Sequence, residues 1–257
     1  MKVRKYEALF SDASNTKKVQ DYLAIEQPLH IFIENNIWMI TMQSPGDEEQ
    51  LVRGLLFTEG VYKQREIEPV FEVKKRSEQG FIAEVNVQFD TADWNKSEIT
   101  KRSLLSAASC GICGTTALKD LESLPRLTHH SLAEQDIHKA FVAMREHQNA
   151  FEKSGGSHAA ALCNAQAELI CVMEDIGRHN AVDKCIGAAL QQKRLDKAKM
   201  LLVSGRVSYE IITKCFIAGV PILAAVSAPS SLAVDFAKEL GITLYAFCRE
   251  DRITRYA

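Results

Sequence analysis

The chain has 257 residues, of which 46% are hydrophobic, enough to fill the core of one large domain or of two unequal ones. Its 31 basic and 33 acidic side chains leave a formal net charge of -2, which does not favour nucleic acid or an anionic membrane as the main partner. The first residues lack the apolar core and cleavage site of a signal peptide, and no later stretch reaches membrane-spanning length. We therefore expect a globular protein that stays in the cytoplasm.

Seven cysteines are scattered through apolar segments, and their odd number argues against a framework of disulfides. A chain of this length has enough core to fold without such cross-links. We therefore expect most of the cysteines to be buried as small hydrophobic side chains.

The first hundred residues predict a strand-rich α+β unit. Two β-rich runs, 31–34 and 37–42, are joined by Asn35-Asn36, residues that tolerate the positive φ of a hairpin turn. Alternating apolar residues over 81–89 predict a half-buried strand, with 71–75 as its partner.

A helix is predicted between these strands. Ser44 is a suitable N-cap, Pro45 suits the first helical position, and Gly60 is a typical C-terminal stop. We expect residues 1–100 to form one domain and residues 101–130 to form a cysteine-containing loop and connection.

Residues 131–257 predict a layered α/β domain. Ser131 and Glu134 have the spacing of a capping box before a helix that continues to Gly155-Gly156. A hairpin over 159–163 and 168–173 and a helix over 179–191 follow. The remaining segments alternate as strand, helix, strand, helix and strand, which predicts a parallel sheet with right-handed crossovers. They are 200–203, 209–218, 222–226, 232–240 and 243–247.

The motif Ser109-Cys110-Gly111-Ile112-Cys113-Gly114 is the sharpest local feature. Small neighbours leave the sulfur of Cys110 accessible, and Lys101 and Arg102 nearby would favour its thiolate. A thiolate attacks a donor persulfide and then holds the transferred sulfur, and Cys113 would be auxiliary.

Three other interpretations of this motif compete with a sulfur-carrying role. A structural zinc site needs four ligands, and the other cysteines and histidines lack the spacing to complete one. A thioredoxin-like redox pair expects the motif after the first strand of a βαβ unit, whereas an antiparallel region precedes it here. A zinc deaminase needs His-x-Glu, which no histidine of the chain provides.

The block EDIGRHNAVDK, residues 174–184, lies between a predicted strand and a predicted helix. Its charges could simply cap the helix. However, Gly177 at a turn and Arg178 and His179 beside a helix N-terminus favour anion binding.

Ligands of parallel sheets bind at the carboxyl ends of the strands. The loops expected there contain Ser204 and Arg206, Ser227, and the segment from Cys248 to Arg249. Hydroxyls, backbone amides and the guanidinium groups of Arg206, Arg249 and Arg252 suit a phosphorylated or nucleotide-bearing ligand. Ser204 and Ser230 could also cap helices.

Together, the cysteine motif, residues 174–184, SGRVSYEI from Ser204 and VSAPSSLAV from Val226 resemble the FdhD family. The residues from Glu26 to Leu29 and from Leu55 to Gly60 resemble the opening of the same family. The resemblance covers nearly the whole chain, and its motifs follow in order.

The resemblance implies a sulfurtransferase required for formate dehydrogenase activity. It would accept sulfur from a cysteine desulfurase as a persulfide on Cys110 and pass it to a molybdenum bis-molybdopterin guanine dinucleotide cofactor, its cargo, for which GDP is a mimic. The family fold is similar to that of cytidine deaminases, with an added strand-rich N-terminal domain, and its members are typically homodimers. The family's cofactor-contacting segment corresponds to Phe247, Cys248, Arg249, Glu250, Asp251 and Arg252.

Two other functions stay open at this point. A non-catalytic cofactor chaperone would bind the cargo without carrying sulfur, and a dithiol oxidoreductase would cycle a Cys110-Cys113 disulfide.

Overall fold

The computed structural model describes residues 2–13, 15–90, 94–95, 125–128, 130–249 and 252–257. None of the helices in these ranges is long and apolar enough to cross a membrane. The N-terminal part contains β1 (Val3–Ser11), β2 (Thr16–Ala24), β3 (Gln27–Ile33), β4 (Asn36–Gln43), α1 (Glu48–Thr58), β5 (Val70–Arg76) and β6 (Ile82–Gln88). The remainder contains α4 (Glu134–Glu146), α5 (Asn149–Ser154), β7 (His158–Cys163), β8 (Leu169–Asp175), α6 (Arg178–Gln191), the 3-10 helix η1 (Leu195–Lys197), β9 (Met200–Val203), α7 (Tyr209–Ala218), β10 (Ile222–Ala225), α8 (Ser231–Leu240), β11 (Thr243–Arg249) and β12 (Arg252–Arg255).

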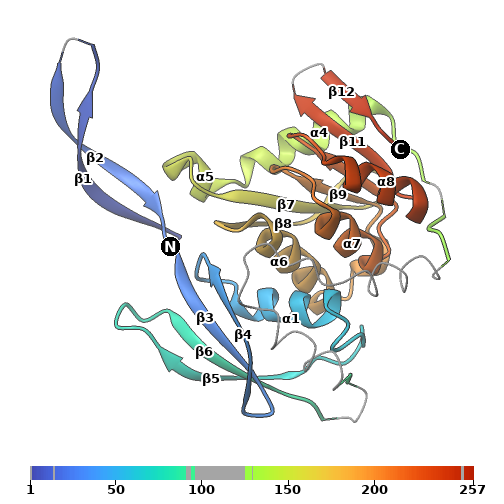
Figure 1. Ribbon diagram of the computed structural model, residues 1–257, viewed down its shortest axis with the longest axis horizontal. Coiled ribbons are helices and arrows are strands. Elements are labelled where there is room, and N and C mark those ends of the chain that lie inside the picture. The colour runs from blue at the N-terminus through green and yellow to red at the C-terminus, as the bar shows by residue number, and fades with distance from the viewer. Residues whose placement is uncertain (1, 14, 91–93, 96–124, 129, 250–251) are drawn as a thin grey trace.

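The strands in the described ranges form three sheets. The order is β12-β11-β10-β9-β7-β8 in a six-stranded sheet and β4-β3-β6-β5 in a four-stranded sheet, while β1 and β2 form a separate two-stranded sheet. The β1–β2 hairpin projects from the rest of the molecule (Figure 1). The mixed α/β class predicted from the sequence is confirmed.

The six-stranded sheet has a core on each face because its side chains alternate in direction. Leu201 and Val203 of β9 face the cluster built with α6, α7 and α8, whereas Met200 and Leu202 face α4. Strands β9, β10 and β11 are parallel and are connected through α7 and α8. This confirms the predicted alternation of strands and helices, although β11 continues to Arg249, beyond the predicted end at Phe247.

Both predicted hairpins are present. In the β3–β4 hairpin the positive φ angles fall on Glu34 and Asn35, at 48° and 65°, one residue before the predicted Asn35-Asn36 turn. The β7–β8 hairpin has its turn at residues 164–168, and the predicted pairing of β5 with β6 is antiparallel.

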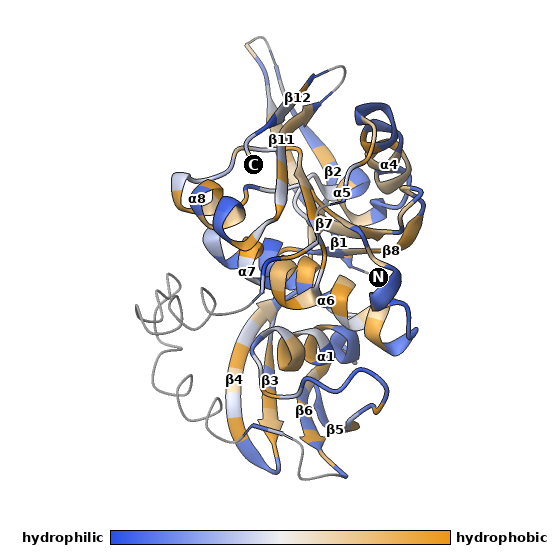
Figure 2. Ribbon diagram, turned by 90° about the vertical axis from the view of Figure 1, so that its right-hand side faces the viewer, coloured by the Kyte–Doolittle hydropathy of each residue, from blue (hydrophilic) through white to orange (hydrophobic). Residues whose placement is uncertain are grey.

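Helices α1 and α6 lie between the two large sheets (Figure 2). They meet so closely that a Cβ atom on Gly54 would lie 1.9 Å from the carbonyl oxygen of Asp183, and one on Gly187 would lie 1.9 Å from that of Gln50. The carboxylate of Asp183 also accepts hydrogen bonds from Thr58 of α1 and Lys214 of α7, both at 2.8 Å. The two layers are thus joined through helix packing and a buried polar contact.

The predicted starts of two helices are wrong. Helix α1 begins at Glu48, because the Ser44 hydroxyl instead accepts the Ile176 amide at 3.1 Å. Helix α4 begins at Glu134 with no side-chain cap from Ser131.

The helix predicted to continue to Gly155-Gly156 is two helices. Helix α4 ends at Glu146, and α5 begins at Asn149. The Glu174 carboxylate accepts the amides of Ala150 and Phe151, both at 2.8 Å. This long-range cap fixes a new helix start.

Candidate functional site

The carboxyl ends of the parallel strands β9, β10 and β11 meet at one edge of the six-stranded sheet. Because β7 runs antiparallel to β9 and β8 antiparallel to β7, the start of β7 and the end of β8 lie at this same edge. His158 and Asp175 pair there. The ends of five strands therefore converge where parallel-sheet proteins bind ligands.

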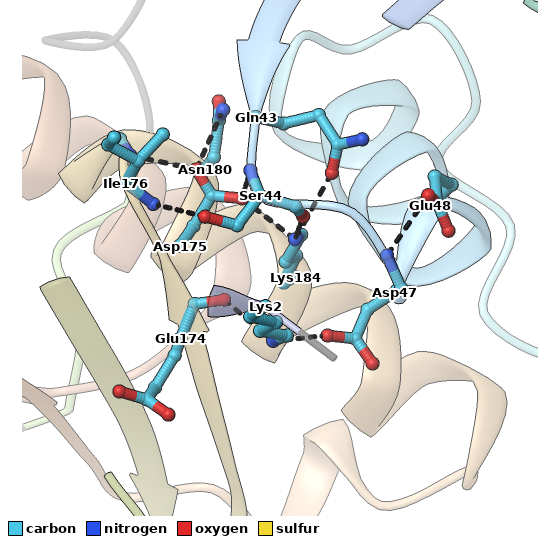
Figure 3. A network of polar contacts seen from close by, with 12 residues as sticks. Lys2, Gln43, Ser44, Asp47, Glu48, Glu174, Asp175, Ile176, Asn180 and Lys184 are labelled. Carbon is cyan, nitrogen blue, oxygen red and sulfur yellow. Dashed lines mark hydrogen bonds and ion pairs between the residues drawn. The ribbon is translucent and has the colours of Figure 1, made fainter. Parts of the chain in front are cut away.

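Asp175 organises the turn between β8 and α6 (Figure 3). One of its carboxylate oxygens accepts the Gly177 amide at 2.7 Å and the Asn180 side chain at 3.2 Å. The other lies 2.7 Å from Lys184 Nζ and accepts the Ser44 amide at 3.0 Å. Since Asp175 is fully buried and uses both oxygens, it holds the turn in one conformation.

Lys184 connects this turn to the N-terminal part of the chain (Figure 3). Its ammonium group donates to the Ser44 carbonyl at 2.6 Å and to Gln43 Oε1 at 3.4 Å. Burial lowers the pKa of Lys184, and the neighbouring Asp175 carboxylate opposes that shift. Asp175 and Lys184 thus have a structural role inside the block that the sequence singled out.

Arg178 is the first residue of α6, and its Nε is buried without a hydrogen-bond partner among the described residues. A buried donor of this kind costs free energy unless a ligand or water satisfies it. The position at the N-terminus of a 14-residue helix adds the partial positive charge of the helix dipole. The arrangement suits an anion.

His179 Nε2 lies 3.1 Å from Ser208 Oγ and 3.1 Å from a carboxylate oxygen of Glu210. A carboxylate only accepts hydrogen bonds, so Nε2 carries the hydrogen of the neutral ring. Burial, Arg178 and Lys214 lower the pKa of His179 to about 4. The ring is therefore neutral near pH 7 and joins α6 to the start of α7.

Gly205 brings the loop after β9 against this turn. A Cβ atom at Gly205 would lie 3.2 Å from His158 Nδ1 and 3.4 Å from Arg178 Cβ, so a side chain would crowd both. Burial lowers the pKa of His158, and Arg178 and the exposed Arg206 lower it further, against the opposing effect of Asp175. Two guanidinium groups and a histidine therefore share this part of the edge.

Ser204 does not cap a helix. Its hydroxyl accepts the Ala159 amide at 2.9 Å and so ties the loop after β9 to β7. In contrast, Ser230 does cap a helix: its hydroxyl accepts the Ala233 amide at the start of α8 at 3.2 Å.

The loop after β10 and the end of β11 form the other part of the edge. The Phe247 amide donates to the Ser227 carbonyl at 3.3 Å, and Arg249 Nε donates to the Val226 carbonyl at 3.1 Å. Phe247 has a φ of 53°, a conformation that a bulky residue seldom adopts. The Arg252 guanidinium lies 5.1 Å from the centre of its ring.

The two parts of the edge are joined. Val207 forms a parallel bridge with Pro229, and its amide donates to the Ala228 carbonyl at 3.1 Å. The structure thus brings Arg178, His179, Ser204, Arg206, Ser227, Phe247, Arg249 and Arg252 to one edge of one sheet.

Other predicted site residues lie elsewhere. Cys248 is buried in the core that faces α4, and burial raises the pKa of its thiol to about 11, so it presents no thiolate to the edge. Cys110, Cys113, Glu250 and Asp251 lie outside the described residues. Among the described residues, no group of three or more histidine, cysteine or acidic side chains is arranged to hold a metal ion.

Sequence reasoning missed three residues of this edge: His158, Ser208 and Glu210. The antiparallel placement of the predicted 159–163 strand could have indicated His158, since its start would lie beside the carboxyl ends of the parallel strands. No pattern in the sequence indicated that His179 meets the start of α7.

Comparison with known proteins identifies the family of the chain. Residues 24–257 match the model of the FdhD/NarQ family. The chain belongs to this family. FdhD/NarQ relatives include proteins named sulfur carrier protein FdhD from Mycolicibacterium paratuberculosis and Saccharolobus solfataricus. The first is 41% identical over 243 residues, covering 91% of this chain and 89% of the relative, and the second is 34% identical over 261 residues, covering 100% and 96%.

A solved structure shares the fold. It is that of a protein from Desulfotalea psychrophila described as a formate dehydrogenase accessory protein, with a TM-score of 0.76 and 23% sequence identity. The match covers 99% of this chain and 96% of that one. The two proteins therefore share the mixed α/β fold.

Proposed function

We propose that the chain is a sulfur carrier that accepts sulfur as a persulfide on Cys110 and delivers it to a molybdenum cofactor. The observation that carries this proposal is the match over nine-tenths of the chain to relatives named sulfur carrier proteins. The glycine-flanked Cys110 and Cys113 supply the chemistry that such a role requires.

The first step is sulfur transfer from a cysteine desulfurase. The Cys110 thiolate attacks the outer sulfur of the desulfurase persulfide, forming a new S–S bond while the old one breaks. The desulfurase cysteine leaves as a thiolate, and the outer sulfur stays on Cys110. Cys113 is auxiliary in this scheme. In the second step the outer sulfur of the Cys110 persulfide is transferred to the molybdenum of the cargo: the S–S bond breaks, Cys110 leaves as a thiolate, and the metal of the cargo supplies the two electrons that reduce the transferred sulfur to sulfide.

The cargo is a bis-molybdopterin guanine dinucleotide cofactor, bound as a substrate at the carboxyl edge described above. Arg178 supports this proposal because its buried Nε lacks a partner among the described residues and lies at a helix N-terminus. Arg249 and Arg252 are exposed beside Phe247, where they can reach phosphate or the guanine edge.

The proposal has further parts. The partners are a cysteine desulfurase and the formate dehydrogenase that receives the cofactor. The protein acts as a homodimer in the cytoplasm, and its six-stranded layer is related to the cytidine deaminase fold.

The decisive experiment is mass spectrometry after incubation with a cysteine desulfurase and cysteine. We expect the mass of one added sulfur on Cys110, its loss in Cys110→Ala, and its retention in Cys113→Ala. An unmodified wild-type chain would instead indicate a non-catalytic cofactor chaperone. A Cys110-Cys113 disulfide with turnover of protein substrates would indicate a dithiol oxidoreductase.

Calorimetry with GDP tests the cargo site separately. We expect Arg178→Ala and Arg252→Ala each to weaken GDP binding about tenfold, the loss of one charge-assisted contact, and Arg249→Ala to weaken it as well. Arg76→Ala is the matched control, because Arg76 is an exposed residue of β5 in the four-stranded sheet and donates to the Gly80 carbonyl at 3.1 Å. If GDP does not bind, or if the edge variants bind it as tightly as the wild type, the cargo site lies elsewhere.

A further inference from the structure

A second pair of cysteines, unrelated to the Cys110 motif, lies between β8 and α6. The sulfur atoms of Cys171 and Cys185 are 3.2 Å apart. The Cys171 thiol also lies 3.3 Å from the Cys185 carbonyl oxygen, and the Cys185 thiol lies 3.6 Å from the Cys171 carbonyl oxygen. These reciprocal contacts hold the two side chains toward each other across the strand–helix interface.

The two thiols differ in their access to solvent. Cys171 is half-buried on β8, the outermost strand at one end of the six-stranded sheet, whereas Cys185 is fully buried in α6. The hydrogen bond from Cys185 lowers the pKa of Cys171 against the effect of burial, while burial raises the pKa of Cys185. Cys171 is therefore the thiol of the pair that ionises first and meets reagents first.

We propose that Cys171 and Cys185 form a redox-active dithiol that a hydroperoxide converts into a disulfide. The Cys171 thiolate attacks the hydroperoxide, the O–O bond breaks, and the products are a sulfenic acid on Cys171 and an alcohol or water. The Cys185 thiol then attacks the Cys171 sulfur, forms the S–S bond and releases water. The two thiols lose two electrons in total, and the hydroperoxide takes them up.

The geometry favours this reaction over oxidation of the other described cysteines. A disulfide has an S–S bond of about 2.05 Å, which the pair reaches by a small closing movement of side chains that already face each other. Burial raises the pKa of Cys163 to about 12 and also raises that of Cys215. Among the described cysteines, a sulfur–sulfur contact is seen for Cys171 and Cys185 alone.

A disulfide at this position would enclose the turn that presents Arg178 and His179. The two cysteines are 14 positions apart, and the whole segment from the end of β8 to the first turns of α6 lies between them. Closing such a loop removes conformational freedom from the unfolded chain, so we expect oxidation to raise the midpoint of thermal unfolding by about 5 °C.

The test is peptide mapping of the purified full-length protein. The reduced protein is treated with hydrogen peroxide, its remaining thiols are blocked with N-ethylmaleimide, and it is digested with trypsin without reductant. We expect the peptide 154–178 to be linked to the peptide 185–193, with fragment spectra that place the bond on Cys171. Peptide 154–178 also contains Cys163, so Cys163→Ala, which should keep the link, is the matched control for Cys171→Ser, which should lose it.

Each other outcome counts against the proposal. The proposal is wrong if the native wild-type protein gives no 154–178 to 185–193 link at peroxide levels that oxidise Cys110, or if the bond maps to Cys163. A link that disappears in the Cys110→Ser/Cys113→Ser variant would mean that oxidation passes through exchange with that motif, and would overturn direct oxidation. None of these readouts depends on sulfur transfer, so they do not bear on the proposed sulfur-carrier function.

Discussion

At the scale of single residues, His179 makes stability depend on pH. Its pKa in the folded protein is about 4, below the ordinary value of 6.5, because burial and Arg178 disfavour the charged ring. The unfolded chain therefore binds a proton between these pH values and the folded chain does not. The stabilisation is present above pH 6.5 and is lost as the pH falls toward 4. The lowered pKa of His158 acts in the same direction below pH 6.5.

We expect His179→Gln to reduce this loss. The free energy of unfolding of both proteins is measured with urea at pH 7.5 and at pH 5. The difference between the two proteins at pH 7.5 gives the cost of the lost contacts to Ser208 and Glu210, which is subtracted at pH 5. The wild type should lose more stability between the two pH values than the variant does. Equal losses would show that His179 does not carry the dependence.

Asp175 is the residue on which the turn before α6 depends. Asp175→Asn would leave the buried Lys184 ammonium without its counter-ion, and removing one partner of a buried pair costs about 3 kcal/mol. Urea unfolding measures the change. Asp136→Asn is the matched control, because its pair with Lys139 is exposed and should contribute less than about 1 kcal/mol. A similar small effect for both variants would contradict the structural role of Asp175.

At the scale of elements, the contact between α1 and α6 requires glycine at two positions. A methyl group on Gly54 or Gly187 would overlap the backbone of the other helix, which must then move away. We expect Gly54→Ala and Gly187→Ala each to lower the free energy of unfolding by at least about 2 kcal/mol, as overpacking does.

Gly156→Ala is the control for these variants. The nearest atom to its added methyl group would be Ala24 Cβ at 3.5 Å, an ordinary packing distance. Thermal unfolding of the three variants gives the comparison. If Gly187→Ala is as stable as Gly156→Ala, the helices are not in the close contact described here.

At the scale of the whole molecule, the part predicted best from the sequence is the parallel region of the six-stranded sheet with its connecting helices. The segments around β9, β10 and β11 are short apolar runs separated by helices, a pattern that has few other solutions. In contrast, the β1–β2 hairpin was not predicted, because both of its faces mix charged and apolar residues. Tyr6, Leu9 and Phe10 are exposed on it, so burial does not impose a clean alternation.

Two departures from the predicted helices, the start of α1 and the separate start of α5, share one physical cause. Ser44 has the residue type of an N-cap, but its hydroxyl bonds to Ile176, 132 positions away. Glu174 starts α5 in the same long-range manner. Local patterns contain no information about partners at such separations.

The candidate site was predicted loop by loop, because each loop follows a recognisable strand and the topology places strand ends together. The sequence did not indicate which side chains of a loop are bonded inside the protein and which lack a partner. Within residues 174–184, the buried Nε of Arg178 has no hydrogen-bond partner among the described residues, whereas Asp175 and Lys184 are paired in the interior.

This division has a genetic consequence. Residues 174–184 contain side chains that hold two layers of the molecule together, Asp175, Asp183 and Lys184. They also contain Arg178, whose buried Nε has no hydrogen-bond partner among the described residues and which we propose to bind the cargo. In a collection of loss-of-function alleles, substitutions of the first three should be temperature-sensitive and open to rescue by stabilising second-site suppressors. Substitutions of Arg178 should be equally defective at every temperature, with no such suppressors. A single stretch of eleven residues would thus yield two separable classes of mutant.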